Sequence, residues 1–274
     1  MIQRKTTGSI VCPNCGKLIS ANSKECYNCG RKNPGLWGYG SSLNKLLGNF
    51  SDMIYIIVVV NVVLYILCII IDPGALLRPQ GVFGLLSPSG QALDRLGMTG
   101  QYALTQGHWW TLITAIYLHG GILHILFNML WLRQLGNMVR DLFGTSRTFI
   151  IFTFSGVVGF VASYIFGISF TIGASGSIFG LLGALVYYGR KRGGHFGTAI
   201  YRQVGMWALV LFLFGFMMPA VNNWAHAGGF IGGYLSAMAL GFHEIGLENK
   251  NHRMIARFLT VLTVISFLLV LIIY

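Results

Sequence analysis

A serine and a histidine each stand near the start of a hydrophobic stretch. Ser175 lies between small residues in Gly173-Ala174-Ser175-Gly176, and His226 lies in Ala225-His226-Ala227-Gly228-Gly229. A serine hydroxyl is a weak nucleophile until a base takes its proton, and an imidazole with an ordinary pKa of about 6.5 is suited to that transfer. If the two side chains meet, they form a dyad that can hydrolyse a peptide bond.

His124 and Asn128 could complete such a site, because their four-residue spacing puts them on one face of a helix. The tetrahedral intermediate of acyl transfer carries an oxyanion, which these two side chains and the amide of Ser175 could stabilise. A packing role inside the membrane is the alternative for each group. The seven acidic residues all lie in expected loops or at the ends of spans, so the sequence predicts a dyad and not a triad.

Composition shows which elements must position these groups. The chain is 54% hydrophobic and only 9% charged, whereas soluble domains carry roughly 25% charged residues. About 20 apolar residues cross a bilayer, so the sequence predicts an all-α integral membrane protein. We expect seven spans, at about 53–71, 113–132, 148–166, 175–189, 204–218, 224–242 and 258–274.

The basic residues indicate the orientation of these spans. Of the 19 Lys and Arg residues, all but Arg78 and Arg95 fall before the first span or beside connections on one side. Because short cytoplasmic loops collect basic residues, we expect the N-terminus in the cytoplasm and the C-terminus outside. The net charge of +12 is spread along the headgroup level of one membrane face, which argues against nucleic acid as a partner.

The candidate groups are expected at similar depths. Only 15 residues separate Ser175 from Arg190 at the cytoplasmic end, about 22 Å of helix against a hydrocarbon core of about 30 Å. Ser175 should therefore lie below the outer surface, preceded by irregular backbone over 167–174, which must be buried in protein or line a water-filled cavity. His124 and His226 lie within about one turn of the same depth.

Two CxxC pairs precede the first span. Their spacing is typical of a zinc ribbon, in which two knuckles together present four thiolates to one tetrahedral zinc. Two disulfides are the alternative, which the cytoplasmic placement disfavours. We expect structural zinc and no catalysis here, since four cysteine ligands leave no position for a substrate. Docking to a cytoplasmic protein partner, regulation of the membrane-embedded part and stability alone stay open as the role of this segment. The expected ligands are Cys12, Cys15, Cys26 and Cys29.

The chain resembles the rhomboid family of intramembrane serine proteases in three motifs: His124-Ile-Leu-Phe-Asn128, Gly173-Ala-Ser175-Gly176 and Ala225-His226-Ala-Gly228-Gly229. The resemblance implies a rhomboid-like core of six transmembrane helices, here followed by a seventh C-terminal helix and preceded by the zinc ribbon. We expect a ribbon at 1–33, a linker at 34–50, a core at 51–245 and the last connection and helix at 246–274.

In function, the resemblance implies a serine endopeptidase that cuts transmembrane protein substrates within the lipid bilayer. Ser175 would be its nucleophile, His226 its base, and His124 and Asn128 its oxyanion stabilisers, with no cofactor for catalysis. A prokaryotic inner membrane is the expected location. A non-catalytic rhomboid-like protein that binds membrane helices is the main alternative, and a channel or transporter is a third.

Some residues near the motifs are expected to be ordinary. Ser177 should bond its own backbone, His119 should be interfacial, and Trp109 and Trp110 should be aromatic-belt anchors. The loop at about 72–108 often ends in Trp-Arg in the family, but here it reads Trp109-Trp110-Thr111, which leaves its usual anchor missing. Phe179 replaces a frequent tyrosine, and its ring could pack on His226.

Overall fold

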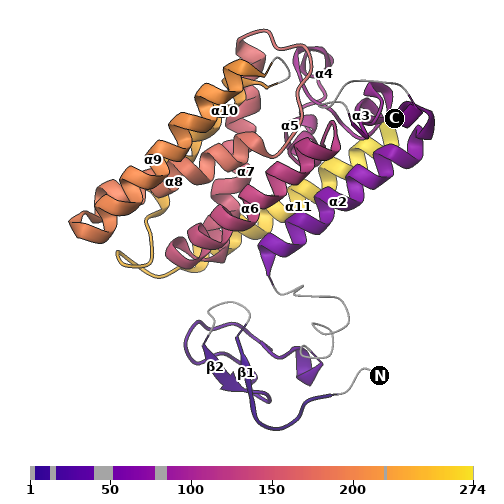
Figure 1. The fold of residues 1–274 in the computed structure, drawn as a ribbon. Coiled ribbons are helices and arrows are strands. Elements are labelled where there is room, and N and C mark those ends of the chain that lie inside the picture. Colours follow the sequence, from indigo (N-terminus) through magenta and orange to yellow (C-terminus); the bar gives the residue numbers. More distant parts are fainter. Residues whose placement is uncertain (1–3, 13–16, 40–51, 78–84, 219–220, 274) are drawn as a thin grey trace. The chain divides into compact units, whose positions relative to one another are not determined.

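A computed structural model of the chain describes residues 4–12, 17–39, 52–77, 85–218 and 221–273. The chain divides into two compact units, Met1–Ile57 and Val58–Tyr274, which we describe separately (Figure 1). Cys15 and most of the predicted linker at 34–50 lie outside the described residues. The division between ribbon, linker and core therefore stays a prediction.

The N-terminal unit is a small β-structure. Strand β1 (Ser9–Val11) pairs antiparallel with β2 (Leu18–Ser20), and Ile10 lies opposite Ile19. The first residues of the predicted linker belong to this fold, because the 3-10 helix η1 (Leu36–Gly38) returns to the start of the chain. There the amide of Lys5 donates a 2.8 Å hydrogen bond to the carbonyl of Gly38.

The second unit is all-helical, as predicted. The short helices are η2 (Pro73–Leu77), α3 (Gly90–Arg95), α4 (Gln101–Thr105), α5 (Thr111–Thr114) and η3 (Ala115–Tyr117). The long helices are α2 (Met53–Ile71), α6 (Ile122–Phe143), α7 (Thr145–Ile165), α8 (Ser175–Arg192), α9 (Gly194–Met217), α10 (Asn223–Leu240) and α11 (Lys250–Ile273).

Six of the seven expected spans each overlap most of one long helix, whereas the one expected at 113–132 is broken and covers η3, part of α5 and only the first half of α6. Length and composition support fewer crossings than seven. Among the described residues, α2, α7, α9 and α11 qualify individually, and the pair formed by 111–117 and α6, bent by 93°, makes up to five. Three basic residues end α8, while Asn223, His226 and several glycines lower the hydropathy of α10. The count of seven spans remains a prediction.

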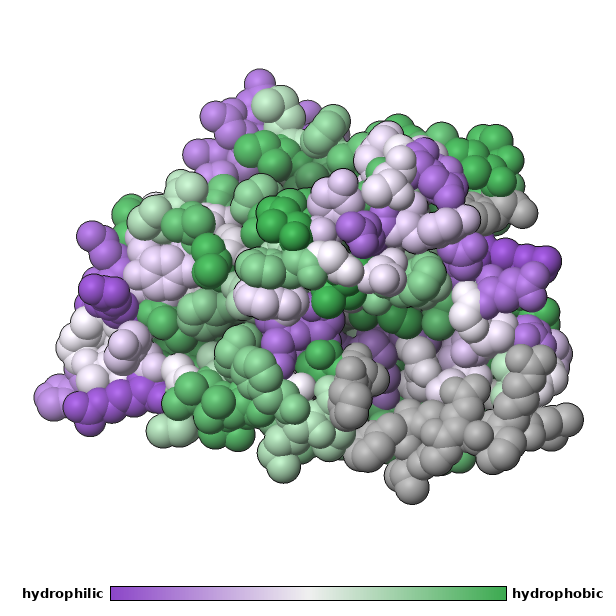
Figure 2. Space-filling model, turned by 90° about the horizontal axis from the view of Figure 1, so that it is seen from above, coloured by the Kyte–Doolittle hydropathy of each residue, from purple (hydrophilic) through white to green (hydrophobic). Residues whose placement is uncertain are grey.

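Helix α7 is the interior helix among the candidate spans. In its most apolar stretch 61% is buried, compared with 28% for α2, 22% for α9 and 11% for α11. The outer helices instead expose large apolar side chains, and Figure 2 shows broad hydrophobic areas on one face of the molecule. Exposed examples include Val63, Ile66 and Ile70 on α2, Leu213 and Phe216 on α9, and Val261 and Leu268 on α11.

Glycines let α8 and α10 approach each other closely, as their spacing predicts. A Cβ atom added at Gly233 would collide with the backbone of Gly180, and one added at Gly229 would lie 2.7 Å from the carbonyl carbon of Gly176. Backbone atoms within a helix cannot move aside as a flexible side chain can. The two helices that carry Ser175 and His226 therefore meet only because these positions lack side chains.

We expect Gly233→Ala to destabilise the bundle, because the added methyl overlaps helix backbone and overpacking costs about 1–3 kcal/mol or more. The midpoint of thermal unfolding in detergent should fall by about 5 °C or more. Gly205→Ala is the matched control: nothing lies within 4 Å of its added Cβ in α9. Its midpoint should stay equal or rise, since alanine is the better helix former. Equal midpoints for both variants would contradict the close approach.

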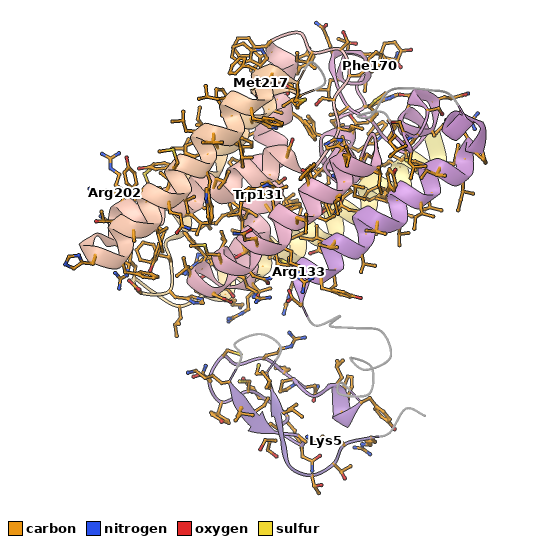
Figure 3. All side chains as sticks on the ribbon, viewed as in Figure 1. Lys5, Trp131, Arg133, Phe170, Arg202 and Met217 are labelled. Carbon is orange, nitrogen blue, oxygen red and sulfur yellow. The ribbon has the colours of Figure 1, made fainter. Side chains whose placement is uncertain are left out.

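One end of the helical bundle carries charged residues and the other carries large apolar ones. Figure 3 shows Arg202 near the beginning of α9 and Met217 at its other end, where Phe170 also lies. At the end where α8 stops, Arg192 pairs with Glu244 at 3.0 Å. The hydrogen bond from Arg192 holds the pKa of the Glu244 carboxyl below its usual range. This contact joins the last turn of α8 to the connection after α10.

Candidate active site

Helix α8 begins at Ser175, and irregular backbone precedes it, as predicted. Residues 166–174 contain no helix, and Gly173 has a φ of +116°, which favours glycine. Ala174 is the N-cap residue and makes no side-chain cap. Within the part of the chain that the structure describes, the Ser175 hydroxyl makes no hydrogen bond to its own backbone. It is therefore free for another partner.

The packing of α8 on α10 brings the surroundings of Ser175 and His226 together. The ring of Phe179, one turn after Ser175, stacks on the imidazole of His226 with centroids 4.2 Å apart and planes 13° apart. A Cβ atom at Gly176 would lie 3.4 Å from the carbonyl oxygen of Ala225. The residue after the serine thus faces the residue before the histidine.

The histidine ring is fixed by stacking and is 6% exposed. Its Nδ1 atom is buried and has no hydrogen-bond partner among the described residues. In that same part of the chain, no hydrogen bond joins His226 to Ser175. Hydrogen bonds between catalytic groups are often long before substrate binds, so the arrangement remains compatible with proton transfer.

His124 lies against the backbone just before the serine. Its Nδ1 accepts a 3.3 Å hydrogen bond from the amide of Gly120. In the neutral ring Nε2 must then carry the hydrogen and act as a donor. A Cβ atom at Gly173 would lie only 2.7 Å from this Nε2. Glycine at position 173 therefore provides both the backbone conformation and the space for the donor.

Asn128 follows on the same face of α6 and is 7% exposed. Its amide nitrogen donates a 2.8 Å hydrogen bond to the carbonyl of His124, one turn earlier. One amide hydrogen remains for another acceptor. In the described residues, Asn128 makes no hydrogen bond with Ser175 or His226. His124 itself lies directly beside the irregular backbone at 166–174, which we call the serine loop.

Three neighbouring residues differ from expectation. His119 is not interfacial: it is fully buried, and its ring packs edge-on against His124 at 4.8 Å. Trp110 is only 8% exposed and stacks on His108, so of the two tryptophans Trp109 alone is on the surface. Ser177 does not bond its own backbone, since its buried oxygen has no partner in the described part of the chain. The sequence pattern does not show whether these side chains are buried or which groups they contact.

The loop before α5 has an anchor that does not require the missing arginine. Thr99 and Thr171 form an antiparallel bridge, in which the amide of Thr171 donates to the carbonyl of Thr99 at 2.7 Å. The hydroxyl of Thr111 donates to that of Thr99 at 3.0 Å, and Thr114 donates to the carbonyl of Gly97 at 2.7 Å. This loop therefore braces the irregular backbone that leads to Ser175.

The N-terminal unit contains a separate cluster of cysteines. The sulfur atoms of Cys12, Cys26 and Cys29 lie within 4.8 Å of one another, and those of Cys12 and Cys29 are 3.7 Å apart. Two thiolates at about 2.3 Å from one tetrahedral zinc are about 3.8 Å apart, so this spacing fits zinc and excludes a disulfide between that pair. Cys15, the fourth predicted ligand, lies outside the described residues.

Cys12 and Cys26 make equivalent backbone hydrogen bonds. The amide of Cys12 donates to the carbonyl of Lys17, and that of Cys26 donates to the carbonyl of Arg31, both at 2.8 Å. Burial raises the pKa of the Cys26 thiol, but hydrogen bonds from the backbone of Asn28 and Cys29 and from neighbouring thiols lower it more, to about 7. A thiol with a low pKa is readily deprotonated, which is the form that binds metal.

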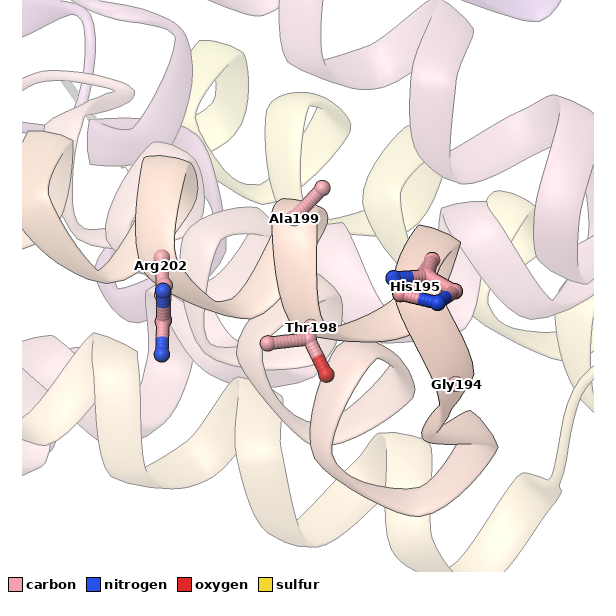
Figure 4. Close-up of a pocket in the computed structure, with 5 residues that line it drawn as sticks. All are labelled: Gly194, His195, Thr198, Ala199 and Arg202. Atoms are coloured by element: carbon pink, nitrogen blue, oxygen red, sulfur yellow. The ribbon is translucent and has the colours of Figure 1, made fainter.

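A surface hollow of about 500 Å³ lies on the first turns of α9 (Figure 4). None of the predicted catalytic or metal-binding residues lines it. Its walls are Gly194, His195, Thr198, Ala199 and Arg202.

Fold and site together define an integral membrane protein whose larger unit is all-helical and carries a serine and a histidine on facing, glycine-packed helices. The Rhomboid domain family profile matches residues 106–243, half of the chain. The chain therefore belongs to the rhomboid family.

Several curated proteins are similar to this chain. "Rhomboid protease GluP" of Bacillus subtilis (strain 168) is 35% identical over 182 residues, covering 66% of this chain and 36% of that protein. "RHOMBOID-like protein 5" of Arabidopsis thaliana is 34% identical over 167 residues, 57% of this chain and 52% of the relative. "Inactive RHOMBOID-like protein 8" of the same plant is 31% identical over 151 residues, 54% and 43% of the two chains. The aligned part thus spans about a third to a half of each relative.

Proposed function

We propose that this rhomboid protein is an intramembrane serine endopeptidase in which Ser175 is the nucleophile and His226 the general base. The observation that carries the proposal is the stacking of Phe179 on His226, which aligns the first turn of α8 with that of α10. Similarity to a relative named as a rhomboid protease supports the same activity.

The chemistry follows from the two groups. His226 takes the hydroxyl proton as Ser175 attacks the scissile carbonyl, then gives it to the departing amine, which leaves an acyl-enzyme that water hydrolyses. Serine proteases with a triad orient their histidine through a carboxylate on Nδ1. Here Nδ1 lacks such a partner among the described residues, and the stacked ring of Phe179 holds the imidazole instead.

The oxyanion of the tetrahedral intermediate needs donors beside Ser175. The first amides of a helix have no partner within it, so the amide of Ser175 is free at the positive end of the α8 dipole. Nε2–H of His124 lies beside Gly173, on the same stretch of backbone. The second amide hydrogen of Asn128 completes the proposed set.

We expect His124→Ala and Asn128→Ala each to slow turnover of a reporter substrate by about 10 to 1,000-fold, because each removes one oxyanion donor. The rate constant for reporter cleavage in detergent is the measurement. Asn137→Ala, on the same helix, is the matched control and should keep wild-type turnover. Its side-chain oxygen is buried and has no partner in the described part of α6. Equal turnover for Asn128→Ala and Asn137→Ala would remove Asn128 from the site.

The proposed substrates are transmembrane proteins, cut in or near a membrane-spanning segment. Membership of the rhomboid family and the apolar helices support an integral membrane protein. A prokaryotic inner membrane, with the N-terminus in the cytoplasm and the C-terminus outside, is part of the proposal. The orientation within that membrane rests on the distribution of Lys and Arg between the loops.

A serine-directed fluorophosphonate probe tests the proposal against the alternative of a non-catalytic helix-binding protein. That alternative is favoured by one observation, the similarity to a relative named as inactive. The wild-type chain should be labelled and Ser175→Ala should not, because only an activated serine reacts. Absence of labelling in the wild-type chain, or equal labelling of Ser175→Ala, would favour the non-catalytic function.

For the N-terminal unit we propose a structural zinc held by Cys12, Cys26 and Cys29, with Cys15 as the fourth ligand. Zinc would supply the folding free energy that so small a unit cannot obtain from its core. Docking to a cytoplasmic protein partner belongs to the same proposal. Catalysis needs no metal, since the serine and histidine supply both nucleophile and base.

A further inference from the structure

We propose that Asn222 is a positioning residue that sets the backbone before Ser175 in register with the helix that carries His226. The inference rests on the proposed function of these two residues. Asn222 is the N-cap of α10: its side-chain oxygen accepts a 3.1 Å hydrogen bond from the amide of Ala225. Its amide nitrogen points the other way and donates to two hydroxyl groups, those of Ser163 at 2.7 Å and Thr171 at 3.0 Å.

Each partner of the amide nitrogen belongs to a different element. Ser163 lies in the last turns of α7, is fully buried, and uses its own hydrogen to donate to the carbonyl of Gly159 at 2.9 Å. Its oxygen is therefore left as an acceptor for Asn222. Thr171 is 7% exposed and lies four residues before Ser175 in the irregular stretch. One planar amide group thus joins α7, the serine loop and α10.

The other side of the serine loop is already held by the Thr99 bridge. Thr171 is bonded through its backbone to Thr99 and through its side chain to Asn222. His226 is one turn after Asn222, and its amide donates to the Asn222 carbonyl at 3.3 Å. If Thr171 moves relative to Asn222, Ser175 therefore also moves relative to His226. Misplacement of reacting groups by about 1 Å can cost about 100-fold in rate.

Asparagine performs both tasks at this position, whereas two other common capping residues cannot. Serine and aspartate cap helices as well as asparagine does, because they also offer an oxygen to the backbone amide. Aspartate has no hydrogen to donate, and serine has one hydroxyl on a side chain too short to span both partners. The requirement for one acceptor and two donors distinguishes positioning from simple capping. The sequence alone does not indicate this role for Asn222, because a helix-start signal would reveal only the cap.

The test compares Asn222→Ser with Asn249→Ser in the full-length chain. Serine keeps the cap on α10 but removes the links to Ser163 and Thr171. Asn249 is a matched control, because its oxygen accepts a hydrogen bond from the amide of His252 at the start of α11, away from the dyad. Turnover of the reporter is divided by the number of serines that fluorophosphonate labels at completion, so that only folded, competent molecules are counted.

For Asn222→Ser we expect kcat per labelled serine to fall about 10 to 100-fold, with KM within about 2-fold of wild type. The labelling rate should fall with kcat, while the final extent of labelling and the thermal midpoint stay near wild type. Asn249→Ser should keep the wild-type kcat. Thr171→Val should resemble Asn222→Ser, and the double variant should be no slower than either, because both remove the same link.

Unchanged kcat per labelled serine in Asn222→Ser would overturn the positioning role. A loss of turnover that is explained wholly by a lower labelled fraction would also overturn it, because such a loss indicates a structural role. The same holds if the decreases in kcat of the two single variants multiply in the double variant. These outcomes leave the proposed function intact, provided that the wild-type chain cleaves and Ser175→Ala does not. A wild-type chain that neither cleaves nor labels would overturn both proposals.

Discussion

Ser175→Ala and His226→Ala should each abolish cleavage of a reporter protein with a single transmembrane segment. The first variant lacks the attacking oxygen, and the second lacks the base that takes its proton. In serine proteases such losses reach about 10⁶-fold in kcat, so cleavage should fall at least about 1,000-fold, below detection in membranes. Product formation on immunoblots of membranes that hold equal amounts of each variant is the measurement.

The double variant and a neighbouring serine sharpen this test. Because nucleophile and base act as one unit, Ser175→Ala combined with His226→Ala should be no less active than either single variant. Ser177→Ala should keep wild-type cleavage, since it removes a buried hydroxyl without a partner in the described part of the chain. Residual cleavage by Ser175→Ala, or its loss in Ser177→Ala, would show that the nucleophile is wrongly assigned.

Removal of zinc should unfold the N-terminal unit and leave the helical unit intact. Structural zinc in peptides of this kind contributes about 10–16 kcal/mol of apparent binding free energy, which exceeds what a small core supplies. Metal analysis of the full-length chain should find one zinc per molecule. After chelation, or in Cys12→Ser, limited proteolysis should cut rapidly within residues 4–39 while the helical unit stays protected.

Cys68 offers the matched control for the cysteine substitution. It is fully buried on α2 among Ala92, Leu93 and Leu118, outside the cysteine cluster. Cys68→Ala should therefore retain one zinc per chain and an intact N-terminal unit. A metal-free wild-type chain whose N-terminal unit resists proteolysis would eliminate the structural zinc.

Local pattern was sufficient for the helices and for the candidate groups. The start of α8 at Ser175 and the irregular backbone before it follow from the short distance to Arg190, and they are confirmed. The glycine spacing predicted the close approach of α8 and α10, and the aromatic residue one turn after the serine was expected on the imidazole. The patterns behind these predictions lie a few positions apart within one helix, where 3.6-residue periodicity determines which side chains share a face, although two of the contacts they predicted join α8 to α10.

Sequence by itself determined the membrane class, the helix positions, the cysteine pairs and the rhomboid motifs. Only the tertiary structure decided that His124 presents Nε2–H beside Gly173, that His119 is buried, and that Thr99 and Asn222 hold the serine loop from two sides. Each of these contacts joins a loop residue to an element distant in the chain or depends on how a turn folds. Periodicity carries no information about such contacts, because close packing of whole helices selects the loop conformation that forms them.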